Sequence, residues 1–112
     1  MTSGTLPPSA GSGARVKPAR VPAAARAALA LLPRLQAGTL SVRTPDGATH
    51  QATGATRAEL HATLHVHDWA MFGATMRAGD IGFAEGFLAG HWTTPHLADL
   101  LRLLLANRAV IE

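Results

Sequence analysis

Alternating polar and apolar residues on either side of a Pro-Asp-Gly turn constrain the fold of this 112-residue chain more than any other feature. Residues 39–43 alternate as a half-buried strand does, residues 45–47 supply the turn, and residues 48–52 complete a hairpin. Residues 59–67 alternate again, with leucine, alanine and valine on one face and polar residues on the other. A small antiparallel sheet of three or more strands with one apolar face needs helices to cover it, so the predicted fold class is α+β.

Four helical segments are predicted around these strands. The first begins at Pro22 and continues to about residue 32, because Pro33 then removes a backbone hydrogen-bond donor. Asp68 is expected to cap a second helix, which ends near Gly79, and Asp80 to cap a third. Both helices carry aromatic residues at helical spacing, which indicates that each buries one face.

The last helix is unusually rich in leucine. Thr94 and Pro95 are typical of a helix start, and six leucines follow between residues 97 and 105. One buried face of an amphipathic helix requires fewer apolar residues than this. Leu103 and Leu105 are therefore expected to contact a second copy, a catalytic domain or lipid; the alternative is that both fold under the N-terminal helix.

Positive charge is concentrated at the N-terminus. Residues 1–20 are rich in Gly, Ser and Pro and predict a disordered basic tail, followed by a single domain over residues 21–112. The first 35 residues hold no acidic residue and five basic ones: Arg15, Lys17, Arg20, Arg26 and Arg34. Such an arm can contact the phosphates of an anionic lipid surface, or it can simply be solvated.

Several functional classes are not expected. The chain has no cysteine, which excludes disulfides, thiolate nucleophiles and iron–sulfur ligation and fits a cytoplasmic location. It has no apolar run of ~20 residues for a membrane span and no signal-peptide pattern. Phosphate-binding and dinucleotide-binding glycine motifs are absent, and a body without a basic stripe is not expected to bind nucleic acid.

Histidines and one glutamate are the remaining candidates for chemistry. His61 and His65 share a strand face but would lie ~13 Å apart at ~3.3 Å per residue, so only His65 and His67 could share an ion. No metal or cofactor is therefore predicted. Glu85 lies between two phenylalanines and is expected to be either a buried acceptor or a partner contact, with no catalytic role assigned to it.

One segment has a residue pattern that is specific enough to suggest a protein family. Residues 79–92, GDIGFAEGFLAGHW, resemble the G-D-x-G-x-x-E-x-Y-x-x-G-x-W segment of the cyclopropane-fatty-acyl-phospholipid synthases. Residues 38–47 resemble that family's opening G-x-L-x-V…P-D-G hairpin, and residues 59–68 and 97–101 fit its third strand and the following helix. The resemblance covers about residues 35–107.

This resemblance extends only to the N-terminal domain of the family. It implies a domain similar in outline to sterol carrier folds, which helps to engage phospholipid or fatty-acyl chains and subunit partners. The S-adenosylmethionine-dependent methyltransferase domain would follow residue 112, so this chain alone is not expected to be an enzyme. A homodimer, a separate methyltransferase partner and a peripheral position at the inner membrane surface are the expected associations; the alternative is a stand-alone lipid-binding or adaptor module.

The resemblance and the apolar pattern together predict contact residues for lipid or partners. Phe87 replaces the family's usual tyrosine, and Thr93 and His96 replace acidic residues, so polar functions at these positions are not carried over. The alternative for the apolar candidates is that they simply form the core. The predicted contact residues are Trp69, Phe72, Phe83, Glu85, Phe87, Trp92, Leu103 and Leu105.

Overall fold

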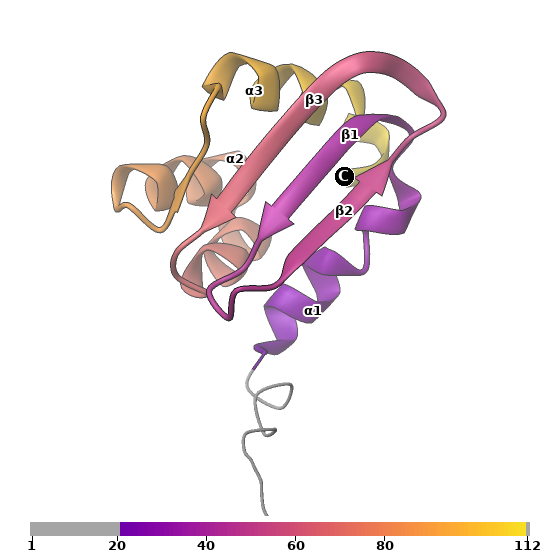
Figure 1. The fold of residues 1–112 in the computed structure, drawn as a ribbon. Helices are drawn as coiled ribbons and strands as arrows, with labels where there is room; N and C mark the ends of the chain where they lie inside the picture. The colour runs from indigo at the N-terminus through magenta and orange to yellow at the C-terminus, as the bar shows by residue number, and fades with distance from the viewer. Residues whose placement is uncertain (1–20, 112) are drawn as a thin grey trace, which may run out of the picture.

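A computed structural model describes residues 21–111 as a four-stranded sheet with helices packed on one face (Figure 1). Residues 1–20, on which the predicted tail falls, and residue 112 lie outside the described residues. In chain order the elements are α1 (Ala23–Leu29), the 3-10 turn η3 (Leu32–Arg34), β1 (Ala37–Arg43), β2 (Thr49–Thr53), β3 (Thr56–Val66), α2 (Ala70–Leu88), β4 (Trp92–Thr93), α3 (Leu97–Ala106) and α4 (Arg108–Ile111).

The α+β class is confirmed, but the sheet is mixed and not purely antiparallel. Its strand order is β2-β1-β3-β4, and β3 pairs with β1 in parallel while β2 and β4 pair antiparallel to their neighbours. The short link between β2 and β3 passes across the start of β1, where Gly54 N–H donates to the Gly38 carbonyl at 2.8 Å. A Cβ on Gly54 would lie 2.2 Å from the carbonyl carbon of Gln36, so only glycine fits this crossing.

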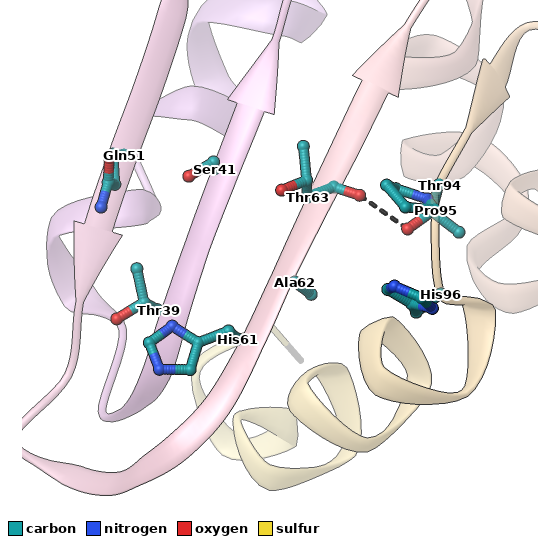
Figure 2. A pocket seen from close by; sticks show the side chains of 9 residues that line it. All are labelled: Thr39, Ser41, Gln51, His61, Ala62, Thr63, Thr94, Pro95 and His96. Atoms are coloured by element: carbon teal, nitrogen blue, oxygen red, sulfur yellow. Dashed lines mark hydrogen bonds between the residues drawn. The ribbon is translucent and has the colours of Figure 1, made fainter.

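The strand alternation places its apolar face against the helices, as expected. Leu40 and Val42 of β1 and Leu60, Leu64 and Val66 of β3 are buried in one hydrophobic core. The opposite face carries hydroxyl and imidazole side chains of β1 and β3 and the Gln51 amide of β2, and no helix covers it in the described residues (Figure 2). The sheet therefore has one apolar covered side and one polar open side.

The helix α2 is a hairpin of two helical halves. Gly79, with φ 57° and ψ −132°, breaks the helical conformation where a boundary was predicted. A Cβ on Gly82 would lie 2.0 Å from the Ala74 carbonyl oxygen, and one on Gly86 would lie 3.5 Å from Met71 Cβ. The two halves therefore pack almost backbone to backbone, which requires small residues along the second half.

Helix starts match the sequence prediction only in part. Asp68 Oδ1 accepts the Ala70 N–H at 2.8 Å at the predicted helix start, although Trp69 and not Asp68 is the N-cap residue. The prediction for Thr94 is wrong, because its hydroxyl donates to the Thr63 carbonyl at 2.6 Å and α3 begins only at Leu97. The first helix ends at Leu29, short of the predicted residue 32, and a 3-10 turn follows.

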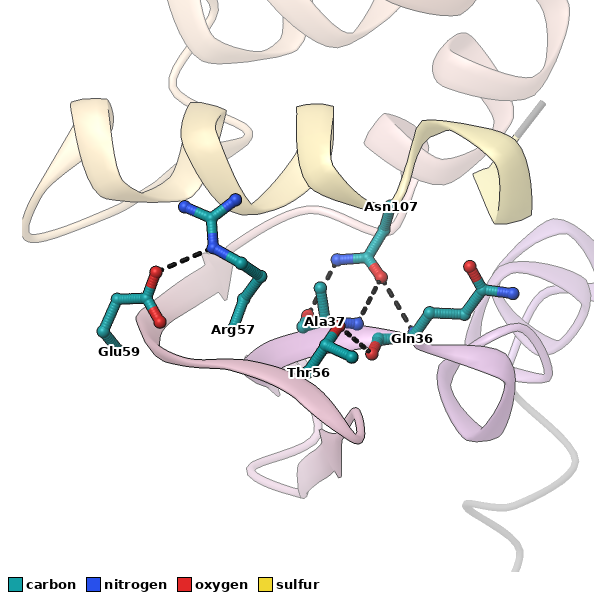
Figure 3. A network of polar contacts seen from close by, with 6 residues as sticks. All are labelled: Gln36, Ala37, Thr56, Arg57, Glu59 and Asn107. Atoms are coloured by element: carbon teal, nitrogen blue, oxygen red, sulfur yellow. Dashed lines mark hydrogen bonds and ion pairs between the residues drawn. The ribbon is translucent and has the colours of Figure 1, made fainter.

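A buried carboxamide joins the end of α3 to the start of β1 (Figure 3). Asn107 is 1% exposed and makes four side-chain hydrogen bonds. Its Oδ1 accepts the N–H groups of Gln36 and Ala37, both at 2.9 Å. Its Nδ2 donates to the carbonyls of Ala37 and Leu103, at 2.9 and 2.8 Å. Every donor and acceptor of this amide is thus satisfied, which a buried polar side chain requires.

We predict that Asn107→Leu lowers the free energy of unfolding by about 2–4 kcal/mol, because it leaves several buried backbone groups without a partner. Urea denaturation measures the change. Gln36→Leu is the matched control, since the Gln36 side chain is exposed and only its backbone N–H belongs to the network. An equal decrease in the free energy of unfolding in the two variants would contradict a structural role for the Asn107 amide.

Candidate functional site

The aromatic residues of segment 79–92 pack on one another. Trp92 is 1% exposed and stacks on Phe83, with ring centroids 4.2 Å apart and planes 19° apart. Phe87 contacts the same indole at 4.9 Å, and Trp92 Nε1 donates to the Phe83 carbonyl at 2.8 Å. This segment therefore fastens β4 to the second half of α2 and does not present Trp92 to a ligand.

The predicted contact residues divide between core and surface. Phe72, Trp92 and Leu103 are buried, so no partner outside the chain reaches them in this structure. Phe83 and Trp69 are half-buried, while Phe87 and Leu105 are exposed. Glu85 is exposed as well, so the alternative that made it a buried acceptor is wrong, and its contact with a partner stays a prediction.

Exposed apolar side chains gather on the helices. Eight large apolar residues of the described chain are exposed, and all of them lie on α2, α3 or α4. Leu88 is the most exposed at 83%. We call this set the helical apolar surface: Met76, Ile81, Phe87, Leu88, Leu97, Leu101, Leu105 and Ile111.

The leucines of α3 explain much of this surface. Leu100 and Leu103 are fully buried against the sheet, whereas Leu97, Leu101 and Leu105 recur every fourth residue on an exposed flank. Apolar residues thus cover about twice the ~100° arc that a single buried face needs. For Leu103 the core alternative holds, but Leu105 is 63% exposed and remains open to contact.

A second apolar feature is a cleft of about 380 Å³ beside α1. Leu29 and Trp69 form part of its apolar wall, and Arg26, Asp46 and His50 supply its polar groups. The Thr44 hydroxyl donates to Asp46 and lowers the pKa of that carboxyl, with a weaker contribution from the Ala48 N–H. The cleft therefore pairs an apolar wall with both an ionised carboxylate and a guanidinium.

No metal-binding group of side chains is found among residues 21–111. Within that range, no three His, Cys, Asp or Glu side chains lie close enough together to hold a metal ion. His67, which the sequence offered with His65 as a possible ion ligand, has its Nε2 atom 2.7 Å from the Thr93 hydroxyl oxygen. None of the helices that the structure describes combines the length and apolar character needed to cross a bilayer.

Comparison of the chain with protein-family models, with curated proteins and with solved structures found no match. The resemblance to the cyclopropane synthases therefore rests on the residues of segment 79–92 and of the strands quoted above.

We predict that Trp92→Phe destabilises the fold by about 1–3 kcal/mol, because it removes the indole hydrogen bond to the Phe83 carbonyl and opens space in the core. Trp69→Phe, at a half-buried site with no side-chain hydrogen bond among those described, should cost less than about 1 kcal/mol. Thermal and urea unfolding of both variants compare the two sites. A larger decrease in the free energy of unfolding for Trp69→Phe than for Trp92→Phe would contradict a structural role for the Trp92 contacts of segment 79–92.

Proposed function

We propose that this chain is a non-catalytic, lipid-engaging and assembly domain of a cyclopropane-fatty-acyl-phospholipid synthase-like methyltransferase. The observation that carries the proposal is the helical apolar surface. Apolar side chains that lie close together on the surface of a soluble protein are typical of sites for a membrane or a partner. Within this set, Leu97, Leu101 and Leu105 form such a stripe along α3. In such an enzyme the methyltransferase domain would supply the chemistry, and this domain would hold the phospholipid substrate.

Charge favours an anionic lipid as the ligand. Arg15, Lys17 and Arg20 precede Val21 in the chain, and Val21 and Arg26 both line the cleft beside α1. Each basic side chain near an anionic membrane contributes ~1 kcal/mol to binding. Together with the apolar side chains, these charges suit a peripheral position at the cytoplasmic surface of a membrane.

Two carboxylates of the described chain have pKa values that do not suit a general acid. The pKa values of Asp46 and Glu59 are both lowered, at Asp46 by the Thr44 hydroxyl and at Glu59 by the Arg57 guanidinium. A general acid working near neutral pH needs the opposite shift. These two carboxylates are therefore suited to fixing local structure.

A second copy of the chain is the other candidate partner, and the spacing of Leu97, Leu101 and Leu105 favours it. A stripe that repeats every fourth residue is self-complementary when two helices meet across a twofold axis. The same side chains would then form a homodimer interface, and lipid would bind elsewhere, for example at the cleft beside α1.

We predict that Leu101→Glu/Leu105→Glu folds normally and lowers affinity for phosphatidylglycerol-containing vesicles at least tenfold, or about 1.4 kcal/mol. Both side chains are exposed, so the core is unaffected, but the added charges oppose insertion into an apolar phase. Cosedimentation with vesicles gives the affinity, and sedimentation velocity gives the oligomeric state.

Thr49→Glu/Ala55→Glu is the matched control, because it adds the same charge at exposed positions away from the helices. Vesicle binding that falls equally in both variants, or that the parent chain lacks, would refute lipid engagement by the helical apolar surface. A parent dimer that the leucine variant converts to monomer without loss of lipid binding would favour the homodimer interface instead.

A further inference from the structure

The open face of the sheet holds a hollow of about 280 Å³ (Figure 2). Its polar lining comes from three strands and from the segment before α3: Thr39, Ser41, Gln51, His61, Thr63 and His96. Its strand residues Thr39, Ser41, His61 and Thr63 alternate with buried core residues, and no residue of the helical apolar surface lines it.

Strand register brings these side chains together. Ser41 pairs with Gln51 on one side and with Thr63 on the other, which forms one row across β2, β1 and β3. Thr39 pairs with His61 in the neighbouring row on the same face. Directly paired residues have Cβ atoms ~5 Å apart, so one small ligand can contact several of these groups.

The far edge of the hollow is fixed by a hydrogen bond. The Thr94 hydroxyl donates to the Thr63 carbonyl at 2.6 Å, which holds the segment before α3 against β3. Figure 2 shows His61 between β1 and β3, and His96 beyond β3 on that segment. The hollow therefore has an imidazole on either side of β3 and hydroxyl and amide groups along its floor.

The chemistry of this lining suits an oxyanion. Hydroxyl, carboxamide and imidazole groups all donate hydrogen bonds, and no carboxylate lines the hollow. Arg43 lies two residues beyond Ser41 on the same face and adds a positive charge. Glu59, the acidic residue nearest to His61 on β3, is paired with Arg57 at 2.7 Å. The lining therefore offers hydrogen-bond donors with no carboxylate among them to compete with a negative ligand.

We propose that this hollow binds the phosphate group of a phosphorylated ligand, either a soluble phosphate ester or the headgroup of a phospholipid. The hydroxyls of Ser41 and Thr63 and the imidazoles of His61 and His96 supply donors to such a group, while the Thr39 hydroxyl lies 3.2 Å from that of Thr53 and can be shared with it. The inference does not depend on lipid engagement by the helical apolar surface, because the two share no residue.

The test is a titration of the full ¹⁵N-labelled chain with inorganic phosphate and, separately, with sn-glycerol 3-phosphate, followed by ¹H–¹⁵N spectra. We expect saturable shifts that centre on Thr39, Ser41, His61 and Thr63. A parallel titration with phosphatidylglycerol vesicles distinguishes the sources. Shifts at the hollow with both kinds of probe indicate a headgroup, and shifts with the soluble probes alone indicate a soluble phosphate ester.

His61→Ala should weaken phosphate binding at least fivefold, whereas His67→Ala, on the neighbouring stretch of chain but outside the hollow, should not. Both histidines are exposed, and the spectra themselves report whether each variant is folded. Ser41→Ala provides a second variant within the hollow, with the same expected direction. No shifts at ~10 mM phosphate would overturn the proposal, because even a Kd of ~1 mM would give about 90% occupancy. Shifts elsewhere, or equal effects of the two histidine variants, would overturn it as well.

Discussion

The Asn107 carboxamide is the polar interaction on which the arrangement of this fold depends. One side chain accepts the N–H groups of Gln36 and Ala37 at the start of β1 and donates to the Leu103 carbonyl in the last turn of α3, so it joins the end of the helix to the start of a central strand. That position sets Leu100 and Leu103 against the sheet. Because a buried amide with four partners tolerates little displacement, it also fixes which flank of α3 stays outside.

The consequence is a domain with two different surfaces. Gly82 and Gly86 allow the two halves of α2 to pack closely. Trp92 packs β4 against the second half, so the aromatic residues of segment 79–92 are used within the fold. The apolar residues left over lie on the outside of α2 to α4, and the polar residues of the strands lie on the uncovered face of the sheet. The two proposed binding sites therefore use different residues.

Local patterns in the sequence predicted the elements better than their pairing. Alternation identified the buried faces of β1 and β3 correctly, and Gly79 marked the break in α2, because both follow from short-range geometry. The parallel pairing of β1 with β3 could not be predicted this way, since alternation is the same for either neighbour. Gly54 marks the place where the link between β2 and β3 crosses the start of β1. A glycine is needed there because the backbone passes close to Gln36, which is distant in sequence.

The candidate sites were predictable to a similar degree. The excess of leucine in α3 indicated an unpartnered flank, but composition could not separate Leu103, which is buried, from Leu105, which is exposed. Asn107 was missed, although it lies four residues after Leu103, on the helix face that packs on the sheet. The polar hollow was missed too, because it forms only when register sets residues of β1, β2 and β3 side by side.

The most direct test asks whether the helical apolar surface contacts lipid. Because the chain has no cysteine, single cysteines can be introduced and labelled at chosen positions. Single cysteines at Ala84 on α2, Ala98 on α3 and Thr49 on β2, all exposed, can each carry a polarity-sensitive fluorophore. On addition of phosphatidylglycerol vesicles, we expect the emission at positions 84 and 98 to shift to shorter wavelength while that at position 49 stays unchanged. A shift at position 49 alone, or no shift at either helical position while the chain cosediments with the vesicles, would contradict lipid engagement by the helices.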